Sequence, residues 1–150
     1  MGWSPFLCRF APVSEIPTLQ ENRTYKQDDD ELFFPSGWTA MDRHFRWSEG
    51  KKASLQFRLA KASLDQGPVR IHIEGNFLGE QQIKALVSGR EKTNQTFTDK
   101  GQFDVDITQE DIDKNGFVKI EFELPQARTP GNGDPRVLAF AFKSLKIVPR

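Results

Sequence analysis

The sequence predicts an all-β fold, an antiparallel jelly-roll-like β-sandwich with one short helical connector near residues 108–114. Two observations predict this class. Apolar side chains recur at every second position along most of the chain, which places one side of each strand in a core and the other in water. Residues that favour turns separate these runs at intervals of about 8–12 residues, a spacing typical of sandwiches and barrels. A length of 150 residues suits one domain with its own core.

Four runs alternate without a defect, at residues 55–59, 69–73, 103–107 and 118–124. Turn-forming residues stand at 65–68, 74–76, 88–89, 99–101 and 115–116. Residues 108–114 are mostly polar and do not alternate. Thr108 is suited to cap the N-terminus of a helix there and Gly116 to end it, so the sequence predicts a connector of one or two turns.

The last run changes parity part of the way along. Leu138, Phe140 and Phe142 are even-numbered, whereas Leu145 and Ile147 are odd-numbered. A strand with a strict period of two cannot bury both sets. One extra residue restores the alternation, so the sequence predicts a β-bulge near Lys143 and Ser144.

The first 23 residues contain three prolines and few pairing signals. We therefore divide the chain into an irregular N-terminal arm, residues 1–23, and a β-sandwich domain, residues 24–150. The arm includes four large apolar side chains that are candidates for contact with a partner: Trp3, Phe6, Leu7 and Phe10.

Charge and composition argue against several partner classes. The 21 Lys and Arg residues balance the 21 Asp and Glu residues, and the two signs are interleaved, so nucleic acid is not an expected partner. The chain lacks an apolar run of about 18 residues, and its first residues do not resemble a signal peptide, so direct membrane insertion is not expected. We expect a cytoplasmic location if the chain is complete, and a periplasmic or other extracytoplasmic one if it is part of a membrane enzyme.

The residue types needed for catalysis are scarce. A Ser or Cys nucleophile needs a neighbouring base, but the chain has two histidines, His44 and His72, and no Gly-x-Ser-x-Gly segment. Its single cysteine, Cys8, lies in the irregular arm. No glycine-rich loop opens a helix, as a phosphate site requires. The sequence therefore predicts a protein that is not an enzyme.

One segment matches the first half of a calcium-binding loop. Asp111, Asp113 and Asn115 supply oxygen atoms at positions one, three and five, and Gly116 follows at position six. Position twelve, which requires a bidentate Glu, is Phe122. We therefore predict no metal or other cofactor and interpret the segment as a polar helix end that turns into a strand. Calcium at Asp111, Asp113 and Asn115 is the weaker alternative.

Three separated segments occur in a characteristic order. Residues 33–39 read Phe-Phe-Pro-Ser-Gly-Trp-Thr, and Trp47 follows nine residues after Trp38, ahead of the alternating strand 53–59. Residues 130–140, with Asp-Pro-Arg at 134–136, lead into the closing strand 142–148. In this order, over residues 24–149, the chain resembles a family of uncharacterised β-sandwich domains appended to bacterial membrane glycosyltransferases and related cell-envelope polysaccharide enzymes.

The resemblance implies a non-catalytic carbohydrate-binding or accessory module of bacterial envelope polysaccharide assembly or glycosyl transfer. It implies a saccharide or envelope glycan as the ligand and a membrane glycosyltransferase as the partner. The family has no accepted catalytic residues to carry over. This chain departs from the family between its two tryptophans, where residues 40–46 are unusually cationic and Asp42 is the available acid.

The candidate ligand-binding residues are Trp38, Asp42, His44, Arg46, Trp47 and Arg136. If they converge on one rim of the sandwich, a sugar can stack on an indole and hydrogen-bond to the charged groups. The structural alternative is that the tryptophans pack against the core, and that Arg136 and an acid such as Asp42 pin two loops together. The sequence does not decide between the two.

Two other functions are alternatives. A structural protein-interaction domain that docks on a partner enzyme, or that self-associates, would expose an apolar patch of roughly several hundred Å². A glycan hydrolase, the weaker alternative, would need two acids or a His–acid pair that converge in a cleft.

Overall fold

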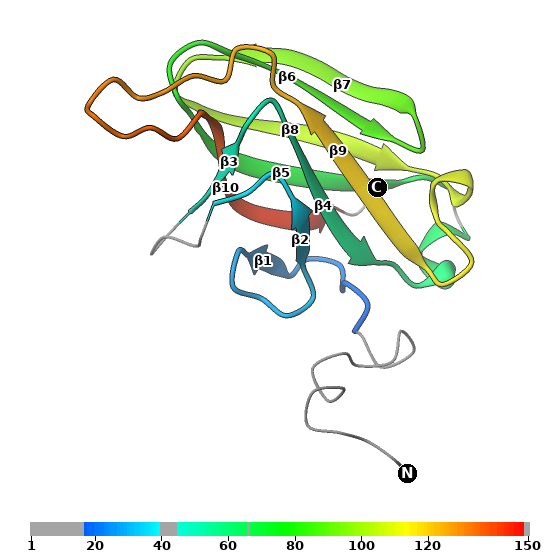
Figure 1. Cartoon of the computed structure of the whole chain (residues 1–150). Helices are drawn as coiled ribbons and strands as arrows, with labels where there is room; N and C mark the ends of the chain where they lie inside the picture. The colour runs from blue at the N-terminus through cyan, green and yellow to red at the C-terminus, as the bar shows by residue number, and fades with distance from the viewer. Residues whose placement is uncertain (1–16, 40–44, 66, 149–150) are drawn as a thin grey trace, which may run out of the picture.

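The computed structural model describes residues 17–39, 45–65 and 67–148, and it confirms the predicted all-β sandwich. Within these ranges, ten strands form two antiparallel five-stranded sheets that lie face to face as two layers (Figure 1). No helix in the described part of the chain has the length and hydropathy needed to cross a membrane.

Sheet A has β10 in the middle. Its strands are β1 (Thr24–Lys26), β3 (Arg46–Glu49), β5 (Val69–Phe77), β8 (Lys100–Ile107) and β10 (Leu138–Val148). β10 pairs with β5 along one side, and β5 in turn pairs with β8. The short strands β1 and β3 pair with different parts of β10, β1 with residues 144–146 and β3 with residues 138–142.

Sheet B has the strand order β2-β4-β9-β6-β7. Its strands are β2 (Phe33–Ser36), β4 (Lys52–Arg58), β6 (Gln81–Val87), β7 (Arg90–Phe97) and β9 (Phe117–Glu123). In the described part of the chain, two short 3-10 helices connect the sheets. They are η3 (Lys61–Leu64), between β4 and β5, and η4 (Gln109–Asp111), between β8 and β9.

Aromatic side chains fill the core between the two layers. Phe140 of β10 is fully buried. The centroid of its ring lies 5.0 Å from that of Phe77 in the same sheet and 5.8 Å from that of Phe122 in the opposite sheet. Tilted aromatic pairs at such separations contribute about 0.5–1.5 kcal/mol each beyond the apolar area that they bury. Phe140 therefore joins the two sheets.

The predicted β-bulge is confirmed. Phe142 pairs with Gly75 and Ser144 with Glu74, so Lys143 is an extra residue on β10. Because of this shift, Phe142 and Leu145 both point into the core, where both are fully buried.

The helical connector is present at the predicted place as a single 3-10 turn. Asp111 Oδ2 accepts hydrogen bonds from the backbone N of Thr108 at 2.8 Å and from its Oγ1 at 3.0 Å. Asp113 Oδ1 then accepts hydrogen bonds from the backbone N of Asn115 at 2.8 Å and of Phe117 at 2.9 Å. Such side-chain bonds compete with the backbone bonds of a longer helix, so the chain turns into β9 instead.

Part of the predicted N-terminal arm lies against the sandwich. Residues 1–16, which include Cys8 and the four candidate contact residues Trp3, Phe6, Leu7 and Phe10, are outside the described ranges. Leu19 is buried and donates a backbone hydrogen bond to the carbonyl of Arg58 at 2.9 Å. Asn22 donates one to the carbonyl of Ile147 at 3.2 Å. The packed domain therefore includes residues that precede position 24.

We expect Phe140→Ala to lower the free energy of unfolding by about 3–5 kcal/mol, because it removes a ring that contacts both sheets and leaves a cavity. Urea denaturation followed by circular dichroism measures the change. Lys119→Ala, on the exposed side of β9, is the control and should stay within about 0.5 kcal/mol of wild type. A loss below about 1 kcal/mol for Phe140→Ala would contradict a ring packed between the layers.

Candidate functional site

Trp38 belongs to the edge of the core. Its indole Nε1 donates a 2.7 Å hydrogen bond to the backbone carbonyl of Ser54. Its ring meets that of Phe34 edge-on, with 5.2 Å between centroids, and lies 6.3 Å from that of Phe122. The polar atom of this indole is thus already bonded inside the protein, and the ring stabilises the sandwich.

Arg46 also points inward. It is paired with Phe142 across β3 and β10, and its guanidinium carbon lies 4.5 Å from the centroid of the Phe34 ring. Burial lowers the pKa of Arg46 from its usual value, as expected for a cation held partly out of water. The contact with the Phe34 ring offsets part of that cost.

Trp47 points the other way. Its neighbour Ser48 is fully buried, and Ser48 Oγ accepts a 2.9 Å hydrogen bond from the backbone N of Phe140. Because side chains alternate along a strand, Trp47 faces away from sheet B. It is partly exposed, and no described residue accepts a hydrogen bond from its indole. The structure therefore does not bring Trp38 and Trp47 onto one surface.

Three further residues were predicted for the rim: Asp42, His44 and Arg136. Asp42 and His44 lie outside the described residues. Arg136 lies in the loop between β9 and β10, where its Nε and Nη2 are 2.9 Å and 2.6 Å from Oδ2 of Asp134. The hydrogen bonds from Arg136 lower the pKa of Asp134. The Asp-Pro-Arg segment therefore forms an ion pair within itself.

The candidate calcium ligands take part in the fold. The side chain of Asp111 is fully buried and forms ion pairs with Arg90 and Lys92 of β7, the latter at 2.8 Å. The Asp113 carboxylate bonds to backbone N–H groups, as described above. Among the described residues, no three His, Cys, Asp or Glu side chains are placed to hold a metal ion. Through these ion pairs, Asp111 connects η4 to β7, the edge strand of sheet B.

The outward side chains of sheet A form rows that run across its strands. The first row is Trp47, Ala141, Asn76 and Lys100. The second row is Lys26, Ser144, Glu74 and Gln102. The third row is Thr24, Lys146, His72 and Asp104, and the fourth is Val148, Arg70 and Asp106. We call these four rows, together with Lys143 of the bulge, the outer face of sheet A.

An open groove of about 340 Å³ lies over the first two rows. We call it the sheet A groove; its lining residues are Glu74, Gly75, Asn76, Lys100, Gly101, Gln102 and Lys143. A Cβ atom at Gly75 would collide with the ring of Phe140, and one at Gly101 with the ring of Phe97. A Cβ atom at either glycine would thus point into the core and not into the groove, which these two residues line with backbone atoms. The other lining residues contribute two ammonium groups, one carboxylate and two amides.

Hydrogen bonds join most of the charged and polar side chains of the third and fourth rows. Nδ1 of His72 lies 2.8 Å from Oδ1 of Asp104, and Nε2 of His72 lies 3.2 Å from Oε1 of Gln102. Nε of Arg70 donates a 3.1 Å hydrogen bond to Asp106. Because these side chains are already bonded to one another, they are less available for contacts with a ligand than the side chains of the sheet A groove are.

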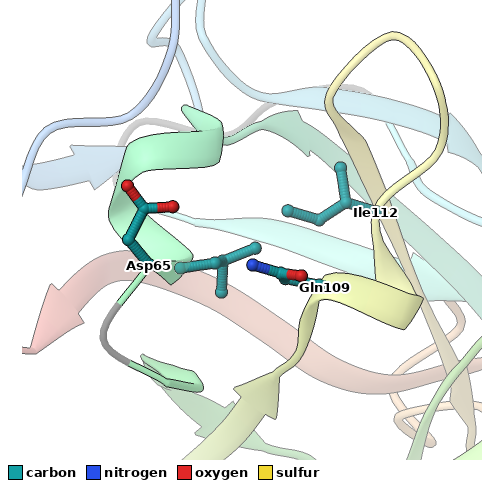
Figure 2. A pocket seen from close by; sticks show the side chains of 4 residues that line it. Asp65, Gln109 and Ile112 are labelled. Atoms are coloured by element: carbon teal, nitrogen blue, oxygen red, sulfur yellow. The ribbon is translucent and has the colours of Figure 1, made fainter.

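Two other cavities are weaker candidates for a ligand site. One, of about 290 Å³, lies at one end of the sandwich between η3 and η4; Figure 2 shows Asp65 across it from Gln109 and Ile112. The other, of about 300 Å³, lies on the outer side of sheet B, and its one aromatic lining residue, Phe122, is fully buried. Neither places a partly exposed aromatic ring beside several polar groups.

The residues of the sheet A groove were not among the candidates predicted from the sequence. The turns predicted at residues 74–76 and 99–101 were wrong, because β5 continues to Phe77 and β8 already begins at Lys100. Alternation along β5 indicates that Glu74 faces outward. It does not indicate that β5 pairs with both β8 and β10, and this pairing brings the groove residues together. The sequence did single out Lys143, because the change of parity predicted a bulge there. Bulges often lie beside functional sites.

Known structures include similar sandwiches. A family 35 carbohydrate-binding module from an environmental isolate matches 85% of this chain and 93% of its own, with a TM-score of 0.56 and 15% identity. A family two carbohydrate esterase from Clostridium thermocellum, solved with cellohexaose, matches 79% of this chain and 33% of its own, with a TM-score of 0.48 and 10% identity. A CBM36-1 domain of a multidomain xylanase, from the hindgut metagenome of Trinervitermes trinervoides, matches 79% of this chain and 96% of its own, with a TM-score of 0.42 and 11% identity. No protein-family model and no curated protein matches the chain. The first likeness supports the sandwich fold.

Asp111 makes stability depend on pH. Burial raises its pKa, but hydrogen bonds from Lys92, Thr108 and Arg90 outweigh burial, so the pKa lies below its usual value of 3.8 in the folded protein. A carboxylate with a lowered folded pKa contributes stability above its unfolded pKa, and this contribution is lost as the pH falls through the folded pKa.

We expect the free energy of unfolding to fall as the pH drops below about 4. Asp111→Asn should cost about 2–3 kcal/mol at pH 7, because Lys92 loses its buried partner, and should cost less at about pH 3. Urea denaturation at both pH values measures this. Glu110→Gln, which alters a neighbouring carboxylate with 78% side-chain exposure, is the control. An equal cost at the two pH values would contradict the assignment.

We expect calcium to leave the melting temperature unchanged, because the carboxylates of Asp111 and Asp113 already accept hydrogen bonds within the protein. Differential scanning fluorimetry after EDTA treatment, with and without millimolar CaCl2, tests this. A rise in Tm that Asp113→Asn abolishes would instead establish calcium binding at the half-motif.

Proposed function

We propose that the chain is a non-catalytic carbohydrate-binding module that binds a saccharide on the outer face of sheet A. The observation that carries the proposal is the partly exposed indole of Trp47, which shares a row with Asn76 and Lys100 beside the open polar groove. Ligand sites combine an apolar surface with a few convergent polar groups, and this face has both.

The spacing along the first row suits a sugar. Neighbouring strands lie about 4.8 Å apart, so the backbones of Trp47 and Asn76, two strands apart, are separated by about 10 Å. Ala141, which stands between them, is fully buried. A pyranose ring that stacks its C–H face on the exposed part of the indole reaches the amide of Asn76 and the groove beyond it. The indole Nε1 of Trp47 supplies a further donor for a hydroxyl group.

The fold supports the same class. The sandwich is similar to that of a family 35 carbohydrate-binding module, with a TM-score of 0.56. At 15% identity this likeness carries over no binding residue. The proposed sugar contacts therefore rest on the outer face of sheet A in this chain.

The motif order supports a more specific role. The segment at residues 33–39, the second tryptophan Trp47 and the Asp-Pro-Arg segment at 134–136 resemble domains appended to membrane glycosyltransferases of the bacterial envelope. In that role the module holds an envelope glycan close to its partner enzyme. It then works on the extracytoplasmic side of the membrane.

We expect the chain to bind at least one saccharide on a glycan array, and Trp47→Ala to weaken that binding by at least about thirtyfold, since truncation of an aromatic hot spot costs about 2 kcal/mol or more. Isothermal titration with the best array ligand measures the change. Trp47→Phe keeps an apolar ring and should lose less affinity.

Lys119→Ala, on the outer side of sheet B, is the matched surface control and should bind as wild type does. Circular dichroism verifies that each variant is folded. A saccharide that binds Trp47→Ala and wild type equally well would place the site elsewhere. Absence of any saccharide signal would direct attention to protein partners.

A further inference from the structure

The charges that line the sheet A groove are unbalanced. Lys143 on β10 and Lys100 on β8 stand on opposite sides of β5, and the groove contains one carboxylate, that of Glu74. Oε1 of Glu74 lies 3.4 Å from Nε2 of His72. Neither lysine forms an ion pair with a described carboxylate, and both are exposed. The groove therefore presents two available ammonium groups.

The neighbouring acids do not neutralise these lysines. Asp104 is bonded to His72, and Asp106 is bonded to Arg70, in the third and fourth rows. The formal charges of Arg70 and Lys146 balance those of Asp104 and Asp106, so that half of the outer face of sheet A is close to neutral. Positive charge is concentrated where the groove lies.

We propose that the saccharide is anionic, and that Lys100 and Lys143 bind its carboxylate or phosphate group in the sheet A groove. The proposal rests on the carbohydrate function proposed above and names the class of sugar. The two lysines lie two strands apart, about 10 Å between backbones, and their long flexible side chains can converge over the strand between them.

An anion in this position improves the energetics of the groove. Two unpaired ammonium groups repel one another, and an anion between them replaces that repulsion with two attractions. Because the lysine ammonium group acts as a point charge, it can bind either a carboxylate or a phosphate without a strict geometry. The amides of Asn76 and Gln102, which line the same groove, can hydrogen-bond the sugar hydroxyls.

Matched pairs of probes test the charge separately from the sugar. The first pair is a glucuronate-containing oligosaccharide and its carboxyl-reduced form, and the second is a phosphorylated oligosaccharide and its phosphatase-treated form. By isothermal titration we expect one acidic form to bind at least about tenfold more tightly than its neutral partner, with the advantage shrinking between about 20 mM and about 500 mM NaCl. The pair that shows the advantage identifies carboxylate or phosphate as the preferred anion.

The double variant Lys100→Gln/Lys143→Gln should reduce this advantage to within about twofold and leave the binding of the neutral form unchanged. Lys119→Gln, the matched charge control on sheet B, should keep the full advantage. An advantage that survives in the double variant would overturn the assignment to these lysines. Equal, Trp47-dependent binding of acidic and neutral forms would overturn the anionic ligand and leave the carbohydrate function standing. If neither member of either pair binds, both proposals fail.

Discussion

The extra residue at Lys143 is the constraint on which sheet A depends. β10 runs for 11 residues and pairs with three other strands. Without the bulge, the second half of β10 would turn Leu145 toward water and Lys146 toward the core. With it, both halves bury apolar side chains, and the register shift lies between the residues that pair with β3 and those that pair with β1. The inserted residue, Lys143, points outward and lines the groove. The bulge that keeps apolar side chains in the core therefore also places a positive charge on the surface.

Periodicity was sufficient to predict the sandwich, its four regular strands and the bulge, because these features follow from which side chains need burial. The site follows from strand order and register, which local patterns do not encode. Trp38 and Trp47 illustrate the difference. Both lie beside or within short strands without extended alternation, so no pattern indicates that Trp38 bonds to Ser54 in the core edge while Trp47 faces outward. The groove residues come from three strands separated in the sequence, and the sequence offered no reason to group them.

Buried and exposed charges have separate roles in this molecule. The buried carboxylate of Asp111 joins η4 to β7, and its partners are committed to it. The lysines of the groove contribute to no ion pair with the described acids and do not pack in the core. Substitutions on the outer face of sheet A can therefore alter ligand preference at small cost in stability, whereas the Asp111 cluster tolerates little change.

The hydrogen bond between the backbone N of Phe140 and Oγ of Ser48 has a consequence for recognition. It holds β3 against β10 from the inside, at the residue next to Trp47. The backbone that carries the indole is thus pre-organised before any ligand arrives. Association then loses little conformational entropy at this strand, and affinity is determined by the contacts formed and the water released.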